Sequence, residues 1–178
     1  MSNFVLYHQE ANKKRLAEDF SMIIKEKIGN NILPTIICIG TDRSTGDSLG
    51  PWVGKLLKEN GYPGKVFGTI HNPVHAMNLQ SLLEENDYFE DDLVIAIDAS
   101  LGDAANIGRI YLRDGSLTPG AGVSREDLPE VGDFHIDGVV NTAGFMEYLV
   151  LQGTRLSLVM DMAEVIADAI ISVFTTEN

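Results

Sequence analysis

The sequence predicts an α/β fold in which a largely parallel sheet carries helices on both faces. Short apolar runs rich in β-branched residues alternate along the chain with longer segments whose apolar residues recur every three to four positions. The short runs are typical of strands buried on both faces, and the longer segments are typical of amphipathic helices. Regular alternation of the two is the pattern of a parallel sheet flanked by helices.

A single domain is expected over residues 1–178, because no linker rich in Pro and Ser and no internal repeat divides the chain. A chain of 178 residues is long enough to bury a core of its own. Within this domain we expect an N-terminal helix at 7–28 and an α/β core at 35–178.

Five elements are predicted in the first half of the chain. The helix at 7–28 places Leu16 and Phe20 on its inner face and ends at Gly29. The apolar run at 35–40 contains three Ile residues and is expected to be a buried strand. The elements that follow are a helix from about 48 to 59, a strand at 65–72 and a helix at 78–86.

The second half is predicted to add three strands and two helices. The segment 91–100 is apolar from Leu93 to Ile97, as in a buried strand, and 107–115 alternates, as in a strand with one wetter face. The segment 116–134 is rich in Gly, Pro and acidic residues, and we expect a long loop there. The remaining elements are a short strand at 135–141 and helices at 144–152 and 156–174.

Charge and cysteine content exclude several classes of protein. The chain has 13 Lys and Arg against 26 Asp and Glu, a net charge of −13 that repels a nucleic-acid backbone. Cys38 is the only cysteine, which excludes an internal disulfide and a cysteine-based zinc ribbon. No segment has the pattern of a secretory signal or a transmembrane helix. We therefore expect a cytoplasmic protein that binds neither nucleic acid nor membranes.

Two aspartates follow neighbouring strands of the predicted sheet. Asp47 lies in the loop after the strand at 35–40, and Asp98 ends the apolar part of the strand at 91–100. The carboxyl ends of parallel strands share one edge of the sheet, and ligands bind at that edge. We therefore expect the two carboxylates to meet there. The alternative is a local role for each, with Asp47 capping the helix that begins near Ser48 and Asp98 capping the next turn.

The chemistry of such a pair follows from its proximity. Two neighbouring carboxyl groups do not both ionise easily, so one of them keeps its proton. The ionised group can activate a water molecule as general base while the other donates a proton to the substrate oxygen, which is the aspartic type of peptide hydrolysis. This chemistry needs no cofactor. A divalent metal would need a third ligand, for which His135 is the candidate.

The loops around the pair supply candidate substrate-binding residues, namely Thr41, Asp42, Ser44, Asn72 and His75. The same region contains a competing motif.

Residues 46–50 spell G-x-S-x-G, a signature of serine hydrolases. A nucleophile elbow needs the serine directly after a strand, whereas several residues separate Ser48 from Gly40. A phosphate-binding loop is disfavoured as well, because G-K-[ST] is missing and Asp42 and Asp47 would repel an anion.

Several segments together resemble a known family. IGTDRSTGDSLGP at 39–51 and VIAIDASLG at 94–102 are similar to segments of the YyaC family of sporulation proteins, relatives of the germination protease of bacterial spores. The later segments that resemble the same family are 119–133, 138–141 and 144–166.

The resemblance implies a fold and an activity. The fold would be the three-layer α/β/α sandwich shared by the germination protease and the hydrogenase-maturation endopeptidases, and the activity would be that of an atypical aspartic endopeptidase. The catalytic aspartates of the germination protease map onto Asp47 and Asp98. Its substrates are the small acid-soluble proteins of spores, which implies a protein or peptide substrate in the sporulating cell or spore. In the hydrogenase-maturation enzymes, the matching carboxylates recognise nickel with a His that has no match here.

Two other functions fit the same residues. One is a non-catalytic sporulation protein that binds a basic or peptide partner through its acidic rim, and the other is a metal-recognising maturation endopeptidase. A homodimer is also expected, because large apolar residues nearly encircle a short helix and such patches usually mark contacts. These residues are Phe145, Tyr148, Leu149 and Leu151.

Overall fold

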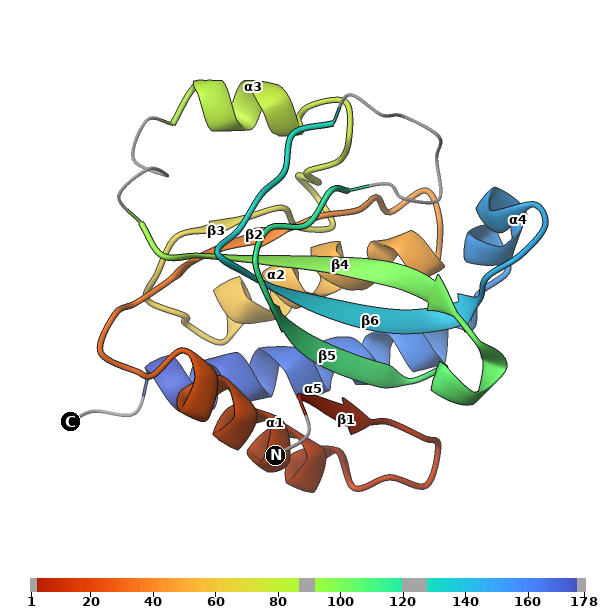
Figure 1. The fold of residues 1–178 in the computed structure, drawn as a ribbon, viewed down its shortest axis with the longest axis horizontal. Helices are drawn as coiled ribbons and strands as arrows, with labels where there is room; N and C mark the ends of the chain where they lie inside the picture. Colours follow the sequence, from red (N-terminus) through yellow and green to blue (C-terminus); the bar gives the residue numbers. More distant parts are fainter. Residues whose placement is uncertain (1–2, 87–91, 120–127, 176–178) are drawn as a thin grey trace.

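A six-stranded sheet in the order β1-β5-β6-β4-β2-β3 organises the chain (Figure 1). The computed structural model describes residues 3–86, 92–119 and 128–175. The strands are β1 (Phe4–Leu6), β2 (Thr35–Cys38), β3 (Val66–Phe67), β4 (Val94–Gly102), β5 (Arg109–Asp114) and β6 (Phe134–Thr142). The neighbours β3, β2, β4 and β6 run parallel, so the predicted α/β fold with a mostly parallel sheet is confirmed.

Strand β5 departs from the parallel arrangement, because it pairs antiparallel with both β1 and β6. The loop after β5 therefore leaves the sheet at the opposite edge from the loops after β2 and β4. Strand β5 ends at Asp114, which lies opposite Phe134 at the start of β6. Its alternation is as predicted, since Ile110 and Leu112 are fully buried while Tyr111 lies on the wetter face.

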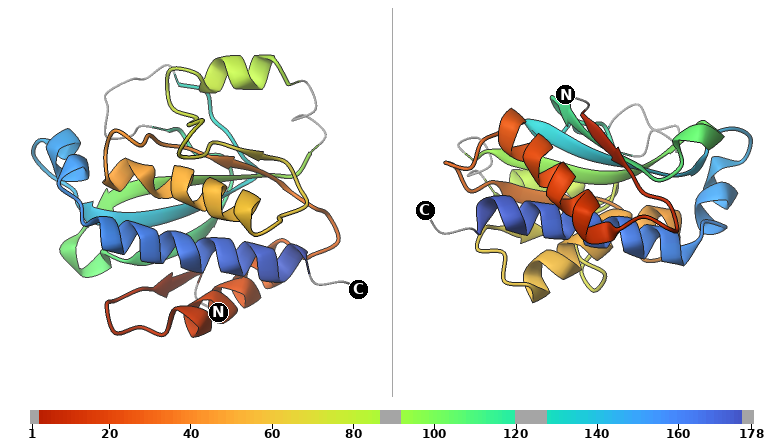
Figure 2. Two further views of the ribbon diagram at one scale, coloured as in Figure 1. Left: turned by 180° about the vertical axis from the view of Figure 1, so that it is seen from behind. Right: turned by 90° about the horizontal axis from the view of Figure 1, so that it is seen from below.

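Three helices, α1 (Lys13–Lys27), α2 (Leu49–Glu59) and α5 (Leu156–Phe174), cover one face of the sheet (Figure 2). The helices predicted at 48–59 and 156–174 are thus confirmed. The larger core lies between these helices and the sheet. It includes Phe20, Leu57 and Ile166 from the helices and Ile36, Ile97, Ile110 and Ile136 from the strands.

The opposite face of the sheet carries a thinner layer. Helix α3 (Leu79–Glu84) and loop residues such as Val74 and Val131 pack there on a second core that includes Ile37 and Ala96. The three-layer α/β/α arrangement is therefore confirmed. On this face the second core ends at Ala96 along β4. A further short helix, α4 (Glu147–Gln152), projects beyond the end of β6 (Figure 1).

The N-terminal segment differs from the prediction of one helix at 7–28. Residues 4–6 form the edge strand β1, and α1 begins only after Asn12, whose side chain accepts a hydrogen bond from a backbone N–H of the first turn. Tyr7 turns inward instead, and its hydroxyl donates to Asp161 Oδ2 on α5 (2.5 Å). Helix α1 therefore begins at its cap Asn12, and Tyr7, which lies before that cap, contacts a helix near the other end of the chain.

Two other boundaries shift for local reasons. Strand β3 ends at Phe67, not at residue 72, because Gly68 turns the chain with a positive φ of 83° and passes close to Cys38. Strand β4 continues to Gly102, so Asp98 lies within the strand and not at its end. Residues 120–127 of the predicted long loop lie outside the described residues.

Cys38 is fully buried, and burial raises the pKa of its thiol. None of the helices in the described ranges is long and apolar enough to cross a membrane.

Candidate active site

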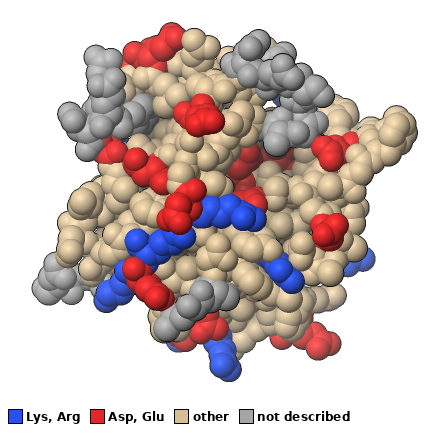
Figure 3. Space-filling view, viewed as in Figure 1, with Lys and Arg blue, Asp and Glu red and all other residues tan. Residues whose placement is uncertain are grey.

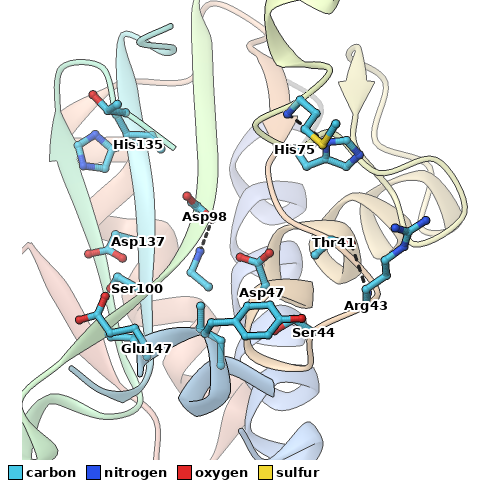
Figure 4. A pocket seen from close by; sticks show the side chains of 17 residues that line it. Thr41, Arg43, Ser44, Asp47, His75, Asp98, Ser100, His135, Asp137 and Glu147 are labelled. Carbon is cyan, nitrogen blue, oxygen red and sulfur yellow. Dashed lines mark hydrogen bonds between the residues drawn. The ribbon is translucent and has the colours of Figure 1, made fainter. Parts of the chain in front are cut away.

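A pocket of about 580 Å³ opens over β4 and β6 on the face of the sheet that α1, α2 and α5 leave free (Figure 4). Six separate parts of the chain line it. Four carboxylates belong to this lining, namely Asp47, Asp98, Asp137 and Glu147. The space-filling view shows acidic side chains gathered around a hollow on this face (Figure 3).

Strand alternation places Asp98 in the pocket. Ile97 points to the helical layer and is fully buried, whereas Asp98 follows Ala96 on the opposite face. The backbone N–H of Ala99 donates to Asp98 Oδ1 (2.8 Å), so the local contact of the capping alternative is present. The carboxyl group nevertheless forms part of the pocket lining, as Figure 4 shows.

Asp47 reaches the pocket from a tight turn that leads into α2. Gly46–Ser48 form one turn of 3-10 helix, and the N–H of Thr41 donates to the backbone carbonyl of Asp47 (3.0 Å). The turn packs closely against the end of β2 because two glycines lack a Cβ. A Cβ at Gly40 would lie 1.9 Å from the carbonyl oxygen of Asp47, and one at Gly50 would lie 2.1 Å from the backbone oxygen of the residue after β2.

The capping role considered for Asp47 has no support in the described part of the chain, because the first turn of α2 has no side-chain cap. The carboxyl groups of Asp47 and Asp98 point toward the same space in Figure 4, as expected from the position of their segments at one edge of the sheet.

The pKa values of these two carboxyl groups are both raised. Burial raises the pKa of Asp98 well above its usual range, the negative charges of Asp47 and Asp137 raise it further, and the hydrogen bond from Ala99 partly offsets these effects. Burial also raises the pKa of Asp47, but the charge of His75 acts in the opposite direction. Burial and the neighbouring negative charges thus favour the protonated form of Asp98, while the charge of His75 favours the ionised form of Asp47.

The sequence-based prediction missed two carboxylates, Asp137 and Glu147. Asp137 lies beside Asp98 in the register of β4 and β6. The sequence does contain a pattern that could have indicated Asp137. His135 and Asp137 lie on either side of the buried Ile136, and alternation along a strand places both on the same face. Glu147 comes from α4, and its place depends on how the chain returns after β6, which no local pattern encodes.

The predicted substrate-binding residues divide into two groups. Thr41, Ser44 and His75 line the pocket, whereas Asp42 and Asn72 do not and have exposed side chains. The role of each in binding a substrate stays a prediction.

The two histidines at the pocket have backbone partners. His135 Nδ1 lies 2.8 Å from the carbonyl oxygen of Gly115, and His75 Nδ1 accepts a hydrogen bond from the N–H of Met77 (3.2 Å). Within the ranges that the structure describes, no three His, Cys, Asp or Glu side chains are grouped so that they could hold a metal ion. The chemistry that the pocket residues can perform themselves is proton transfer between carboxyl groups and a bound molecule.

Exposed apolar side chains border the pocket. Met77 and Tyr148 line it and are 78% and 63% exposed, and next to Tyr148 the chain exposes Phe145 (89%) and Leu149 (51%). Three of the four residues expected to form a dimer contact thus lie on the surface, while Leu151 lines the pocket. Clustered exposed apolar side chains of this size mark contact surfaces.

We expect Asp137→Asn to lower the pKa of Asp98, because the substitution removes one of the two negative charges that raise it. An NMR titration that follows the carboxyl carbon of Asp98 measures this. Asp114→Asn is the control, since its carboxylate is 75% exposed and paired with Lys27, and the pKa of Asp98 should stay as in the wild type. If Asp137→Asn also leaves the titration of Asp98 unchanged, the charge of Asp137 does not raise the pKa of Asp98.

The fold defines the class of the protein. It is similar to the crystal structure of a [NiFe] hydrogenase maturation protease HycI from Thermococcus kodakarensis KOD1, with a TM-score of 0.59 and 23% sequence identity over 86% of this chain and 99% of that chain. The chain is thus an α/β protein with a fold similar to that of this protease.

The chain belongs to the family described as "Protein of unknown function (DUF1256)", whose model matches residues 4–169. The uncharacterized protein YyaC of Bacillus subtilis (strain 168) is 45% identical to it over 172 residues, which cover 96% of this chain and 82% of the relative. The predicted membership of the YyaC family is therefore confirmed.

Proposed function

We propose that the chain is an endopeptidase of the aspartic type, which hydrolyses peptide bonds with an activated water molecule. The observation that supports the proposal is the pair Asp47 and Asp98, two carboxyl groups that line one pocket and whose pKa values are raised to different extents. Such a pair supplies a general base and a general acid at the same pH. The similarity of the fold to that of a maturation protease agrees with this reading of the site.

In this mechanism Asp47 is the general base and Asp98 is the general acid. Asp47 takes a proton from water as the water oxygen bonds to the peptide carbonyl carbon, and Asp98 gives its proton to the carbonyl oxygen. The product of this step is a neutral tetrahedral diol. When the C–N bond breaks, Asp47 gives its proton to the leaving nitrogen, and Asp98 takes one back from a hydroxyl of the diol. Both groups are then in their starting states.

The substrate class that we propose is the small acid-soluble proteins of spores, with cleavage in the cytoplasm of the sporulating cell or spore. This part rests on the resemblance of residues 39–51 and 94–102 to the germination protease.

A second candidate function is the binding of a protein partner without cleavage. The exposed apolar side chains of Met77, Phe145, Tyr148 and Leu149 around the pocket favour it, because surfaces of this kind serve for contact with other proteins.

Cleavage of acid-extracted small spore proteins by the wild type and by Asp47→Asn tests the proposal, with mass spectrometry of the products across acidic and neutral pH. We expect the wild type to cleave and Asp47→Asn to be at least about 10³-fold slower, because it lacks the base. Asp103→Asn is the matched control, since Asp103 is exposed and lies outside the pocket lining. Equal cleavage by all three proteins would remove the Asp pair from the mechanism. Stable capture of a spore protein with no products favours the second candidate.

A further inference from the structure

We propose that Ser44 donates a hydrogen bond to the carbonyl oxygen of the peptide bond under attack, an inference that rests on the proposed peptidase function. Ser44 lies in the loop between β2 and the turn that carries Asp47, and it lines the same pocket. Its side chain is buried, with only 8% of the residue exposed. No protein group in the described ranges forms a hydrogen bond with its Oγ.

Ser44 differs in this respect from the other buried polar residues that the structure describes. Ser48 Oγ donates to the carbonyl oxygen of Thr45 (2.6 Å), and Thr154 Oγ1 donates to the carbonyl oxygen of Val150 (3.0 Å). The other members of the set, Thr35 and Thr69, also have hydrogen-bond partners. A buried hydroxyl without a partner destabilises a folded protein, so folding does not account for a serine at this position. A ligand that accepts the hydrogen bond does account for it.

The loop holds Ser44 in place relative to Asp47. Two backbone hydrogen bonds hold this loop: the N–H of Thr41 donates to the carbonyl of Asp47 (3.0 Å), and the N–H of Ser48 donates to the carbonyl of Thr45 (3.3 Å). Ser44 therefore lies within the short loop that the first of these bonds closes, and the turn after it is closed by the second. Figure 4 shows it with Asp47 and Asp98 among the side chains that surround the pocket. Because the Oγ itself is buried, the hydroxyl turns about the Cα–Cβ bond of Ser44 to meet a bound carbonyl, while the backbone of the loop stays in place.

The carbonyl oxygen can accept more than one hydrogen bond as the tetrahedral intermediate forms. Asp98 transfers its proton to this oxygen, and Ser44 supplies a second hydrogen bond that stabilises the negative charge developing before the transfer is complete. Ser44 itself neither gains nor loses a proton. Its contribution is therefore larger in the transition state than in the bound substrate, so it raises kcat more than it lowers KM.

Four proteins test this inference with the small acid-soluble spore proteins as substrate: the wild type, Ser44→Ala, Ser44→Thr and Ser48→Ala. We expect Ser44→Ala to lower kcat by about 10²-fold with little change in KM. Its Tm should be equal to or higher than that of the wild type, because an unpaired buried hydroxyl is removed. Ser44→Thr keeps the hydroxyl and should retain more activity than Ser44→Ala. Ser48→Ala loses a buried hydroxyl that does have a partner, so it should lower the Tm and leave kcat within a few-fold.

The outcomes separate this inference from the proposed function. If Ser44→Ala cleaves as fast as the wild type while Asp47→Asn is inactive, the role of Ser44 is wrong and the peptidase stands. If Ser44→Ala lowers the Tm as much as Ser48→Ala does, Ser44 has a structural role and the inference is also wrong. If the wild type and Asp47→Asn are equally inactive, the proposed function fails and the role of Ser44 fails with it.

Discussion

Asp98→Asn is expected to abolish cleavage and, at neutral pH, to raise the Tm. The activity should fall by at least about 10³-fold, because an amide cannot donate the proton that the carbonyl oxygen needs. The Tm should rise because the folded protein holds the carboxyl group in an environment where its pKa is well above the usual range. Loss of function and gain of stability from one substitution are the signature of a side chain that serves chemistry at the expense of folding.

The pH dependence of this stability gain has a defined sign. An aspartate in the unfolded chain has a pKa of about 3.9. Since the pKa of Asp98 is higher in the folded protein, the folded state binds more protons than the unfolded state between these two pKa values, and stability falls as the pH rises through that range. Asp98→Asn removes this loss. A pKa difference of one corresponds to about 1.4 kcal/mol, and 1 kcal/mol shifts the Tm of a domain of this size by roughly 2–4 °C. We therefore expect a gain in Tm at neutral pH that disappears below about pH 4.

Asp161→Asn is the matched comparison, because the pKa of Asp161 is lowered whereas that of Asp98 is raised. Burial alone would raise the pKa of Asp161, but hydrogen bonds from Lys13 and Tyr7 outweigh burial and lower it. Asp161→Asn should therefore lower the Tm at neutral pH, and the difference should shrink in acid as the carboxyl group is protonated in the wild type. Differential scanning calorimetry over a pH series measures both variants. If Asp98→Asn lowers the Tm at neutral pH, the environment assigned to Asp98 is wrong.

Gly50→Ala is expected to destabilise the protein by about 4 kcal/mol or more, which is exceptional for a single substitution. In an ordinary helix, replacing Gly by Ala stabilises by about 1 kcal/mol. At this position in α2, however, a Cβ would lie 2.1 Å from the backbone oxygen of Ile39 and 2.8 Å from its nitrogen. The contact is with backbone, so rotation of a side chain cannot relieve it, and α2 would have to move away from the end of β2.

Gly61→Ala separates this steric effect from backbone strain. Gly61 has a φ of 75° and no atom within 4 Å of a Cβ placed there, so the substitution should cost only about 1–2 kcal/mol. Chemical denaturation of both variants gives the free energies of unfolding. If Gly50→Ala and Gly61→Ala lower the free energy of unfolding by the same amount, the close contact between α2 and the end of β2 is not what holds the Asp47 turn in place.

The parts of the fold that follow from local patterns were predictable, and those that follow from distant contacts were not. The spacing of apolar residues gave α5 within its observed bounds, and the parallel arrangement brought Asp47 and Asp98 to one pocket. Alternation does not encode direction, so the antiparallel course of β5 could not be predicted. The strand at residues 4–6 is too short to show an alternating pattern, and it is recognisable as a strand only from its pairing with β5.

The two aspartates come from different kinds of element. Asp98 belongs to a strand paired on both sides, whereas Asp47 lies on a single turn. That turn also packs against the end of α4 and the segment that joins it to α5, because a Cβ at Gly46 would lie 2.9 Å from side-chain atoms of both Leu151 and Thr154. A molecule that rests on α4 would therefore touch the helix that packs directly against the turn carrying Asp47.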